Sequence, residues 1–319
     1  MTSSDRRRRP LAASLLAIVL GLSGCTMQSG AAETHEGPLR IGFVNGGDTL
    51  FHTCLQQAVV TTAKNNLTEI VTADSHQNAA QELSNIKDMI ARRVDVIIVQ
   101  TVDTHALRTD IAEAQDAGIP VFLTSVNAEP SKILGAVVVD LKAVGRLDAQ
   151  WIRENAAGHQ AEVGVIAGAP GAASDLLVGG FTGALPANAR VVASRPGMFD
   201  ATKARQVAAD MIRDHPDLDY VFVANEEMAF AARKAFDAAG GQGVKIVTVN
   251  GTDAGLTALR DGRFAATVAN SAAETGQLAV ENALSLLRHE KADKIDKTPI
   301  SLVTKDNADT APLYCTADY

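Results

Sequence analysis

The stretch "NAAQELSNIKDMIARRVDVIIVQ" at residues 78–100 places a helix pattern directly before a strand pattern. Ile86, Met89 and Ile90 recur at three-to-four-residue spacing, which predicts an amphipathic helix with one buried face. Residues 94–100 form a short run rich in Val and Ile, which is typical of a strand covered on both faces. A helix that leads directly into a buried strand is half of a βαβ unit. The stretch therefore predicts a parallel sheet with helices on its faces.

The same alternation continues along the rest of the chain. Further strands are predicted at residues 39–44, 68–74, 119–124, 136–140, 161–168, 190–195, 219–225, 244–250, 264–270 and 300–304. Further helices are predicted at residues 105–118, 201–216 and 226–241. So many strands exceed one ordinary doubly wound sheet, and no low-complexity linker divides them. We therefore expect two similar α/β lobes between which the chain crosses more than once.

The first residues predict export. A block of four arginines at residues 6–9 precedes a short apolar run at residues 11–22, as in a secretory signal peptide. The tetrapeptide "LSGC" at residues 22–25 resembles the bacterial lipobox, in which the cysteine is lipidated, with palmitate among its acyl groups. We expect residues 1–24 to be removed, Cys25 to carry the lipid, and residues 25–38 to form a flexible tether. An ordinary signal peptide followed by an unrelated cysteine is the alternative.

Composition narrows the class of partner. The formal net charge is −8, four of the arginines lie in the leader, and aromatic residues make up only 4% of the chain. A nucleic-acid-binding face would need a basic patch, and the sequence offers none. We expect the protein to be monomeric and to sit on the outer face of the cell membrane, held there by its lipid anchor.

Two cysteines remain beside Cys25. Outside the cytoplasm an even pair permits one disulfide, here between Cys54 and Cys315. Two unpaired thiols, one of them buried, are the alternative.

Four blocks in a fixed order resemble the type I periplasmic sugar-binding proteins, the ribose/galactose-binding family. They are "DSHQNAAQELSNIKDMI" at 74–90, "RRVDVIIVQTVD" at 92–103, "DHPDLDYVFVANEEMAFAA" at 214–232 and "VNGTDAGLTALRDGRFAATVAN" at 249–270. The resemblance implies two Rossmann-like lobes joined by a three-segment hinge, with a ligand in the cleft between them. It places an N-terminal lobe at 39–139 plus 271–299 and a C-terminal lobe at 140–270 plus 300–319, with crossings near 139–141, 270–272 and 299–301.

Ligands of this fold class bind beyond the carboxyl ends of the parallel strands. The candidate ligand-binding residues are those at predicted strand ends or at matching family positions: Asp48, Phe51, His52, Gln100, Asp103, Phe199, Asn225, Asn250 and Asn270. Asparagine amides suit hydroxyl groups because they both donate and accept hydrogen bonds, although each Asn could instead be a helix cap. The two phenylalanines match the rings that hold a sugar face in the family, although Phe is more often a core residue.

The departures from the family pattern narrow the range of possible ligands. The stretch "GAPGAASDLLVGGF" at 168–181 carries Asp175 and aliphatic residues where family members usually have a charged residue, often arginine. Thr124 and Ser125 stand where the family has Asp-Arg or Asn-Lys after the fourth strand, and Leu141 replaces a frequent asparagine. We therefore expect a smaller or less hydroxylated sugar, or a linear polyol, rather than ribose, glucose or galactose.

No catalytic pattern stands out. The seven histidines show no compact metal-binding spacing, and the chain lacks a GxSxG elbow or a GxGxxG loop in a strand–loop–helix context. We expect neither enzyme activity nor a metal or cofactor. The leading hypothesis is a lipoprotein that captures a small sugar or polyol for an ATP-binding-cassette (ABC) permease. The alternative is a ligand-sensing receptor lipoprotein, for example one that binds autoinducer-2 or serves a sensor kinase.

Overall fold

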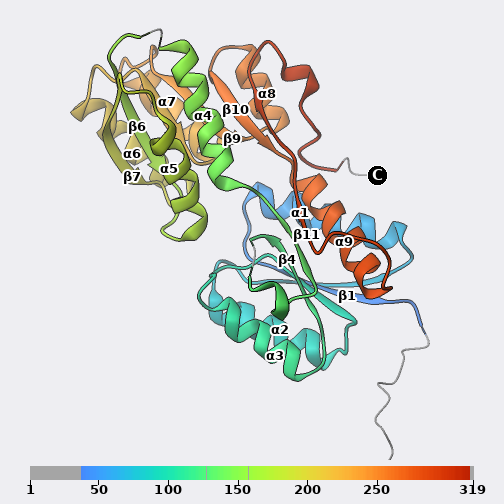
Figure 1. Ribbon diagram of the computed structural model, residues 1–319. Coiled ribbons are helices and arrows are strands. Elements are labelled where there is room, and N and C mark those ends of the chain that lie inside the picture. Colours follow the sequence, from blue (N-terminus) through green and yellow to red (C-terminus); the bar gives the residue numbers. More distant parts are fainter. Residues whose placement is uncertain (1–36, 127, 157, 317–319) are drawn as a thin grey trace, which may run out of the picture. The chain divides into compact units, whose positions relative to one another are not determined.

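The computed structural model describes residues 37–126, 128–156 and 158–316, and it contains two six-stranded sheets built on the same plan (Figure 1). The strands of the first sheet are β1 (Arg40–Asn45), β2 (Glu69–Asp74), β3 (Val96–Val99), β4 (Val121–Ser125), β5 (Gly135–Val138) and β11 (Ile295–Lys297). Those of the second are β6 (Ala161–Ala167), β7 (Ala189–Pro196), β8 (Tyr220–Val223), β9 (Lys245–Asn250), β10 (Ala266–Asn270) and β12 (Ile300–Val303).

The strand orders are β11-β5-β4-β3-β1-β2 and β12-β10-β9-β8-β6-β7. In each sheet the first strand, β1 or β6, lies second from one edge; the next strand lies outside it, and the later strands extend the sheet on its other side. Strand β12 is antiparallel to β10. The predicted fold class, two doubly wound α/β lobes, is therefore confirmed. The predicted signal peptide, Cys25 and the predicted tether up to residue 36 lie outside the described residues.

Helices cover both faces of the first sheet. Helices α1 (Leu50–Asn65) and α9 (Ala272–Leu287) pack together on one face, and α2 (Ala79–Ala91) and α3 (Leu107–Asp116) on the other. In β3, Ile98 belongs to the core under α1 and α9, whereas its neighbours Ile97 and Val99 belong to the core under α2 and α3. Successive strand residues point to opposite faces, and this explains why the strands read as continuous apolar runs.

The second sheet is covered in the same way. Helices α4 (Leu141–Asn155) and α5 (Ala172–Ala184) pair with each other, as do α6 (Ala201–Asp214) and α7 (Glu226–Ala238). The ring of Phe181 in α5 stacks on that of Phe222 in β8, with centroids 4.6 Å apart. Helices α4 and α5 approach closely at Gly145, where a Cβ would lie 2.5 Å from the backbone nitrogen of Phe181. The short helix α8 (Asp253–Arg260) lies between β9 and β10 in the chain.

The chain crosses from one lobe to the other through short connecting segments. Residues 139–141 lead from β5 to α4, Ser271 leads from β10 to α9, and residues 298–299 lead from β11 to β12.

The C-terminal residues differ from the predicted lobe boundaries. The segment after β12 begins in the second lobe, where Ala308 of the 3-10 turn η2 (Ala308–Thr310) joins the core. It does not stay there, because Tyr314 is buried in the first-lobe core under α1 and α9. Burial of this aromatic ring draws the end of the chain back across the hinge, so the prediction that residues 300–319 belong to the second lobe is wrong for Tyr314 and Cys315.

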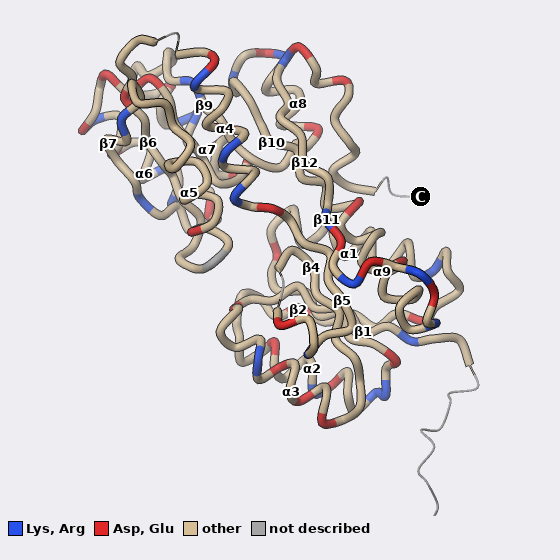
Figure 2. The backbone as a smooth tube through the Cα atoms, viewed as in Figure 1, with Lys and Arg blue, Asp and Glu red and all other residues tan. Residues whose placement is uncertain are grey.

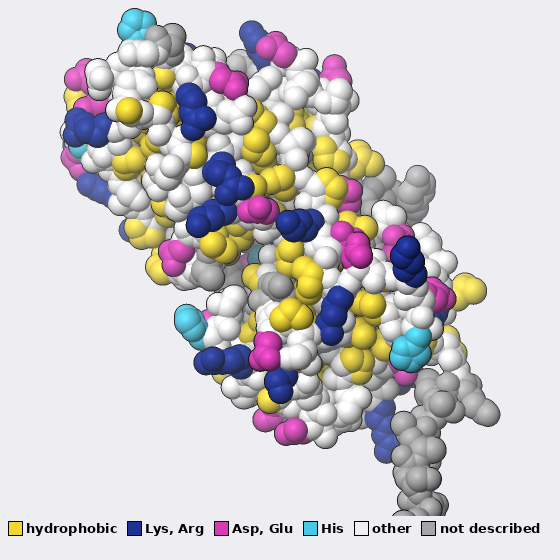
Figure 3. Space-filling model, in the orientation of Figure 1, with side chains coloured by type: hydrophobic (Ala, Val, Ile, Leu, Met, Phe, Trp, Pro, Cys, Tyr) yellow, Lys and Arg dark blue, Asp and Glu magenta, His cyan; other side chains and the backbone are white. Residues whose placement is uncertain are grey.

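Charged side chains of both signs are mixed over the helices and loops, while the strands are largely uncharged (Figure 2). On the face that Figure 3 shows, the two signs are likewise interspersed. Several form surface ion pairs, such as Arg40 with Glu69 at 2.7 Å and Arg190 with Glu162 at 2.8 Å. Exposed pairs of this kind contribute little to stability. None of the helices within the described ranges is both long and apolar enough to cross a membrane.

Candidate functional site

A cavity of about 650 Å³ is lined by residues from both lobes. All of the predicted ligand-binding residues line it except Asp48: Phe51, His52, Gln100, Asp103, Phe199, Asn225, Asn250 and Asn270. Most of them follow strands β1, β3, β8, β9 and β10 at their carboxyl ends, as this fold class requires. The structure thus brings these residues to one place, and their role as ligand contacts remains a prediction.

In the first lobe, His52 fixes the orientation of Gln100. The Nε2 atom of His52 lies 3.1 Å from Oε1 of Gln100, and its Nδ1 lies 2.8 Å from the Thr49 hydroxyl. An amide oxygen only accepts, so Nε2–H donates to Gln100 and Nδ1 accepts from Thr49. Burial lowers the pKa of His52, which keeps the ring neutral and this arrangement intact at neutral pH.

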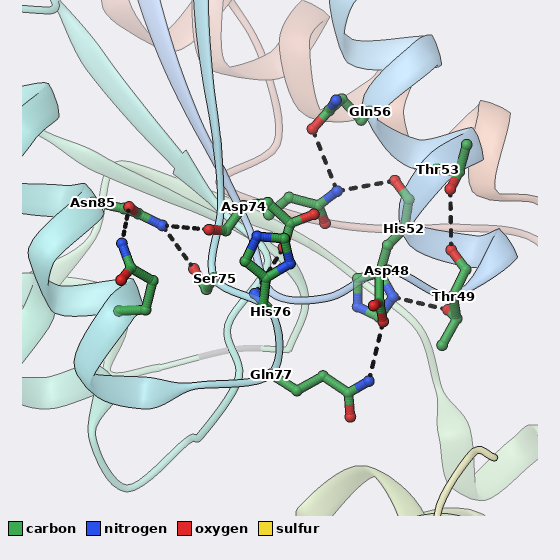
Figure 4. Close-up of polar contacts among 12 residues, drawn as sticks. Asp48, Thr49, His52, Thr53, Gln56, Asp74, Ser75, His76, Gln77 and Asn85 are labelled. Atoms are coloured by element: carbon green, nitrogen blue, oxygen red, sulfur yellow. Dashed lines mark hydrogen bonds and ion pairs between the residues drawn. The ribbon is translucent and has the colours of Figure 1, made fainter.

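Asp48 lies beside the cavity rather than on its wall. Its Oδ1 atom accepts a hydrogen bond of 3.3 Å from Nε2 of Gln77, which does line the cavity (Figure 4). Asp48 therefore holds the side chain of Gln77 at the cavity wall. In the same view, the Asn85 side chain points toward the backbone oxygen of Asp74 and the Ser75 hydroxyl.

In the second lobe, Asn225 is a helix cap as well as a lining residue. Its Oδ1 atom accepts a hydrogen bond of 2.9 Å from the Met228 backbone N–H at the start of α7. Asn225 therefore stabilises the fold as well, because an N-cap side chain contributes about 1 kcal/mol to stability.

Asn250 is held on both sides of its amide. Its Oδ1 accepts from the Glu226 backbone N–H at 3.2 Å, and its Nδ2 donates to the Tyr314 hydroxyl at 2.9 Å. Glu226 is itself buried, and its carboxylate accepts hydrogen bonds from the backbone N–H groups of Gly251 and Thr252 at 2.9 and 3.0 Å. The turn after β9 is therefore rigidly built.

Two buried oxygen atoms on the cavity wall have no hydrogen-bond partner within the described structure. They are Oγ of Ser125, which ends β4, and Oδ1 of Asn270, which ends β10. Leaving a buried polar atom unpaired costs about 1–3 kcal/mol, so such atoms on a cavity wall mark places where a ligand can bind. Ser125 was not among the predicted residues. Ser125 could have been found in the same way as Gln100, because both lie at the end of a predicted strand.

Phe51 and Phe199 provide an apolar surface from each lobe. Phe51 lies in the first turn of α1, and its ring meets His52 edge-on with centroids 5.8 Å apart. Phe199 lies in the loop before α6 with φ of 53°, an uncommon backbone conformation for a residue with a side chain. Its ring packs directly against Gly168, where a Cβ atom would overlap it.

The rest of the wall is mainly apolar and carries little charge. Its aliphatic part includes Val139, Leu141 and Leu177, where α4 and α5 begin. Among the described residues that line the cavity, Asp103 is the only carboxylate, and none is Lys or Arg. No three His, Cys, Asp or Glu side chains gather as metal ligands in the part of the chain that the structure describes.

A buried acid that sequence reasoning missed supports the cavity loop from below. Glu82 of α2 accepts hydrogen bonds from the Thr101 hydroxyl at 2.7 Å and the Val102 backbone N–H at 2.5 Å. Burial raises the pKa of Glu82 to about 8, with a smaller contribution from Asp110, which is also buried. Glu82 lies four residues before Ile86, so the sequence places it on the apolar face of the helix. A carboxylate at such a position indicates a buried acid.

Known proteins share this architecture. A family model described as a periplasmic binding protein domain matches residues 41–291. The chain belongs to this family. The ribose import binding protein of Escherichia coli strain K12 is 32% identical to it over 238 residues, which cover 74% of this chain and 80% of that protein. The resemblance seen in the four sequence blocks is thereby confirmed.

Two further similar proteins come from mycobacteria. The xylitol-binding protein of Mycolicibacterium smegmatis is 28% identical over 301 residues, which cover 92% of this chain and 85% of that protein. The crystal structure of an ABC transporter solute-binding protein from Mycobacterium smegmatis with bound glycerol has a TM-score of 0.82 at 26% identity. That match covers 88% of this chain and 100% of the other.

Proposed function

We propose that this protein binds a small, uncharged sugar or polyol in the cavity between its lobes and delivers it to an ABC permease. The observation that carries the proposal is the pair of unpartnered buried oxygens, Ser125 Oγ and Asn270 Oδ1, in a cavity that also presents Phe51 and Phe199. Ligand hydroxyl groups would donate to these oxygens, and the C–H face of a sugar or polyol would pack against the rings.

The charge of the cavity supports an uncharged ligand. A sugar acid or sugar phosphate needs a cationic partner when its charge is buried, and no Lys or Arg is found among the described lining residues. The relatives named for ribose and xylitol, and the structure with bound glycerol, point to the same class of compound.

Binding, rather than catalysis, is the proposed role. A ligand that contacts Gln100 on one lobe and Asn270 on the other favours the arrangement in which both lobes surround it. Such hinge closure is the signal that a permease can recognise. The protein itself changes no covalent bond of the ligand.

A thermal-shift panel tests the ligand class. Xylitol, D-ribose, glycerol, L-fucose and D-galactose are each added to the purified protein, with D-galacturonate as the charged counterpart of galactose. A neutral compound present at about 100 times its dissociation constant should add about 2.7 kcal/mol to the free energy of unfolding. D-galacturonate should add nothing. Stabilisation by the acid alone, or by no member of the panel, would contradict the proposal.

We also propose that the protein is exported and anchored through lipidated Cys25. The basic block, apolar run and "LSGC" tetrapeptide at residues 22–25 support this. Cell fractionation tests it: wild type should sediment with membranes, and Cys25→Ala should appear in the soluble extracytoplasmic fraction or accumulate unprocessed. Serine substitution at Met27, two positions beyond, serves as the control. Membrane retention of Cys25→Ala equal to wild type would rule out the anchor.

A further inference from the structure

The end of the chain crosses from the second lobe to the first beside the cavity. Residue Asp309 of η2 still pairs with Arg260 of α8 in the second lobe, at 2.6 Å. Five residues later, Tyr314 is buried among first-lobe core residues of α1 and α9. We call Leu313, Tyr314 and Cys315 the C-terminal strap.

The strap is attached to the first lobe at each of its residues. The Ser271 hydroxyl donates to the Leu313 carbonyl oxygen at 2.6 Å, and the Ala273 backbone N–H donates to the Tyr314 carbonyl oxygen at 3.0 Å. Cys315 forms a disulfide with Cys54, which is fully buried in α1. The backbone on both sides of the Tyr314 side chain is therefore held in place.

The Tyr314 hydroxyl reaches back to the second lobe at Asn250. The Glu226 N–H can only donate, so the amide oxygen of Asn250 must face it, and the amide nitrogen must then face Tyr314. The Asn250 backbone has φ of 139°, a conformation that residues with side chains rarely adopt and that persists only when neighbouring groups enforce it. One of the two N–H donors of Asn250 is used by Tyr314, which leaves the other for the cavity.

We propose that Tyr314 is a positioning residue for Asn250, and that the disulfide-anchored strap holds this side chain in the orientation that receives the ligand. Asn250 as a ligand contact rests on the proposed function. The strap itself does not, because the contacts that define it are internal to the protein. Burial raises the pKa of Tyr314 well above its ordinary value, so the phenol remains a neutral hydrogen-bonding group throughout the physiological range.

Tyr314→Phe separates positioning from packing, because it keeps the buried ring and removes only the hydroxyl. The matched control is Tyr220→Phe. It makes the same change at a buried tyrosine in β8 that does not line the cavity. The first measurement needs no ligand. It is the hydrogen-exchange rate of the Asn250 side-chain amide by NMR of asparagine-labelled protein, with the signal assigned by its loss in Asn250→Asp.

Tyr314→Phe should raise this exchange rate about five- to tenfold, the equivalent of one lost hydrogen bond, and Tyr220→Phe should leave it unchanged. An unchanged rate in Tyr314→Phe would overturn the proposal. The variant Cys54→Ala/Cys315→Ala should raise the rate as well. An unchanged rate there would remove the disulfide from the proposal and leave the hydrogen bonds from Ser271 and Ala273 as the anchor.

The second measurement is a double-mutant cycle on calorimetric affinity for xylitol and D-ribose. Tyr314→Phe should weaken binding about five- to tenfold in wild type and not at all in Asn250→Ala. Equal losses in both backgrounds would overturn the positioning role. If wild type binds neither probe while Tyr314→Phe still speeds exchange at Asn250, the strap is supported and the result counts against the proposed function alone.

Discussion

The hydroxyl of Thr101, on the wall of the cavity, donates a 2.7 Å hydrogen bond to the carboxyl group of Glu82, which is fully buried beneath it. Because the same carboxyl group also accepts from the Val102 N–H, one ionisable group holds two successive residues of the cavity loop. Burial, with a smaller contribution from Asp110, raises the pKa of Glu82 to about 8.

Glu82→Gln should change how stability depends on pH. The folded-state pKa of about 8 lies above the ordinary value of 4.5, so the folded protein keeps a proton that the unfolded chain releases. The stability from this group is fully present below about pH 4.5 and is lost as pH rises through 8, at up to about 1.4 kcal/mol per pH unit. Urea unfolding of wild type between pH 4.5 and 8 should show this loss, and Glu82→Gln should show a smaller one.

Other groups with shifted pKa values also contribute to the pH dependence, so the difference between the variants is the measured quantity. Burial raises the pKa of Asp110, which acts in the same direction as Glu82. The lowered pKa of His52 acts in the opposite direction, because the unfolded chain binds the extra proton. The exposed Glu281→Gln serves as the control and should follow wild type. Parallel pH profiles for wild type and Glu82→Gln would show that Glu82 is ionised at neutral pH.

Asn270→Ala and Asn225→Ala should separate ligand binding from folding. Asn270→Ala removes an unpaired buried oxygen, so the ligand-free protein should be as stable as wild type or more so, whereas binding should weaken by about 1–3 kcal/mol. Asn225→Ala removes the cap of α7 and should lower the free energy of unfolding by about 1 kcal/mol. Urea unfolding without ligand and calorimetry with the tightest compound of the panel measure the two effects. Wild-type affinity in Asn270→Ala would place the ligand elsewhere.

Gly168→Ala should displace the ring of Phe199, because the new methyl group would occupy the position of that ring. Loss of part of the aromatic contact should weaken ligand binding by about 1–2 kcal/mol. Gly183→Ala is the matched control: Gly183 is exposed in helix α5, a Cβ there would meet nothing within 4 Å, and the change should raise stability slightly. Calorimetry on the two variants compares them directly, and equal affinities would show that Phe199 does not hold the ligand.

The disulfide between Cys54 and Cys315 should appear as a linked peptide in mass spectrometry of the unreduced protein. It closes a loop with a sequence separation of 261, so Cys54→Ala/Cys315→Ala should lower the free energy of unfolding by about 2–4 kcal/mol. Alkylation of both thiols without prior reduction would contradict the pairing. Dithiothreitol should lower the thermal unfolding temperature of wild type, because it reduces the disulfide. It should have no effect on the double variant.

Patterns of hydrophobicity located most of the fold because they report burial directly. The run at 94–100 predicted β3, which the structure places at Val96–Val99 with both faces covered. Strand β11, Ile295–Lys297, was not predicted, since three residues with two charges carry no periodic signal. Its position at the edge of the sheet beside β5 is decided by tertiary packing alone.

The candidate site was predictable where strand ends decide it and unpredictable where side chains meet across the fold. Gln100 and Asn270 were found from their places after strands, and both line the cavity. The cap at Asn225 is a local contact with Met228, and the sequence offered it as the alternative to ligand binding. The support of Thr101 by Glu82 joins two different elements, and no local pattern reveals it. Tyr314 lies 64 residues from Asn250 in sequence, so their hydrogen bond is visible only in three dimensions.

The two ends of the described chain share one core, and this fixes an order of events during synthesis and folding. The first-lobe core joins residues of β1 and α1 to residues of α9 and to Tyr314, with the entire second lobe lying between them in sequence. A chain that emerges N-terminus first must therefore expose the apolar surface of α1 until the later segments arrive. The lobe whose strands are made first is the last to be completed, and Cys54 cannot form its disulfide before Cys315 has been made.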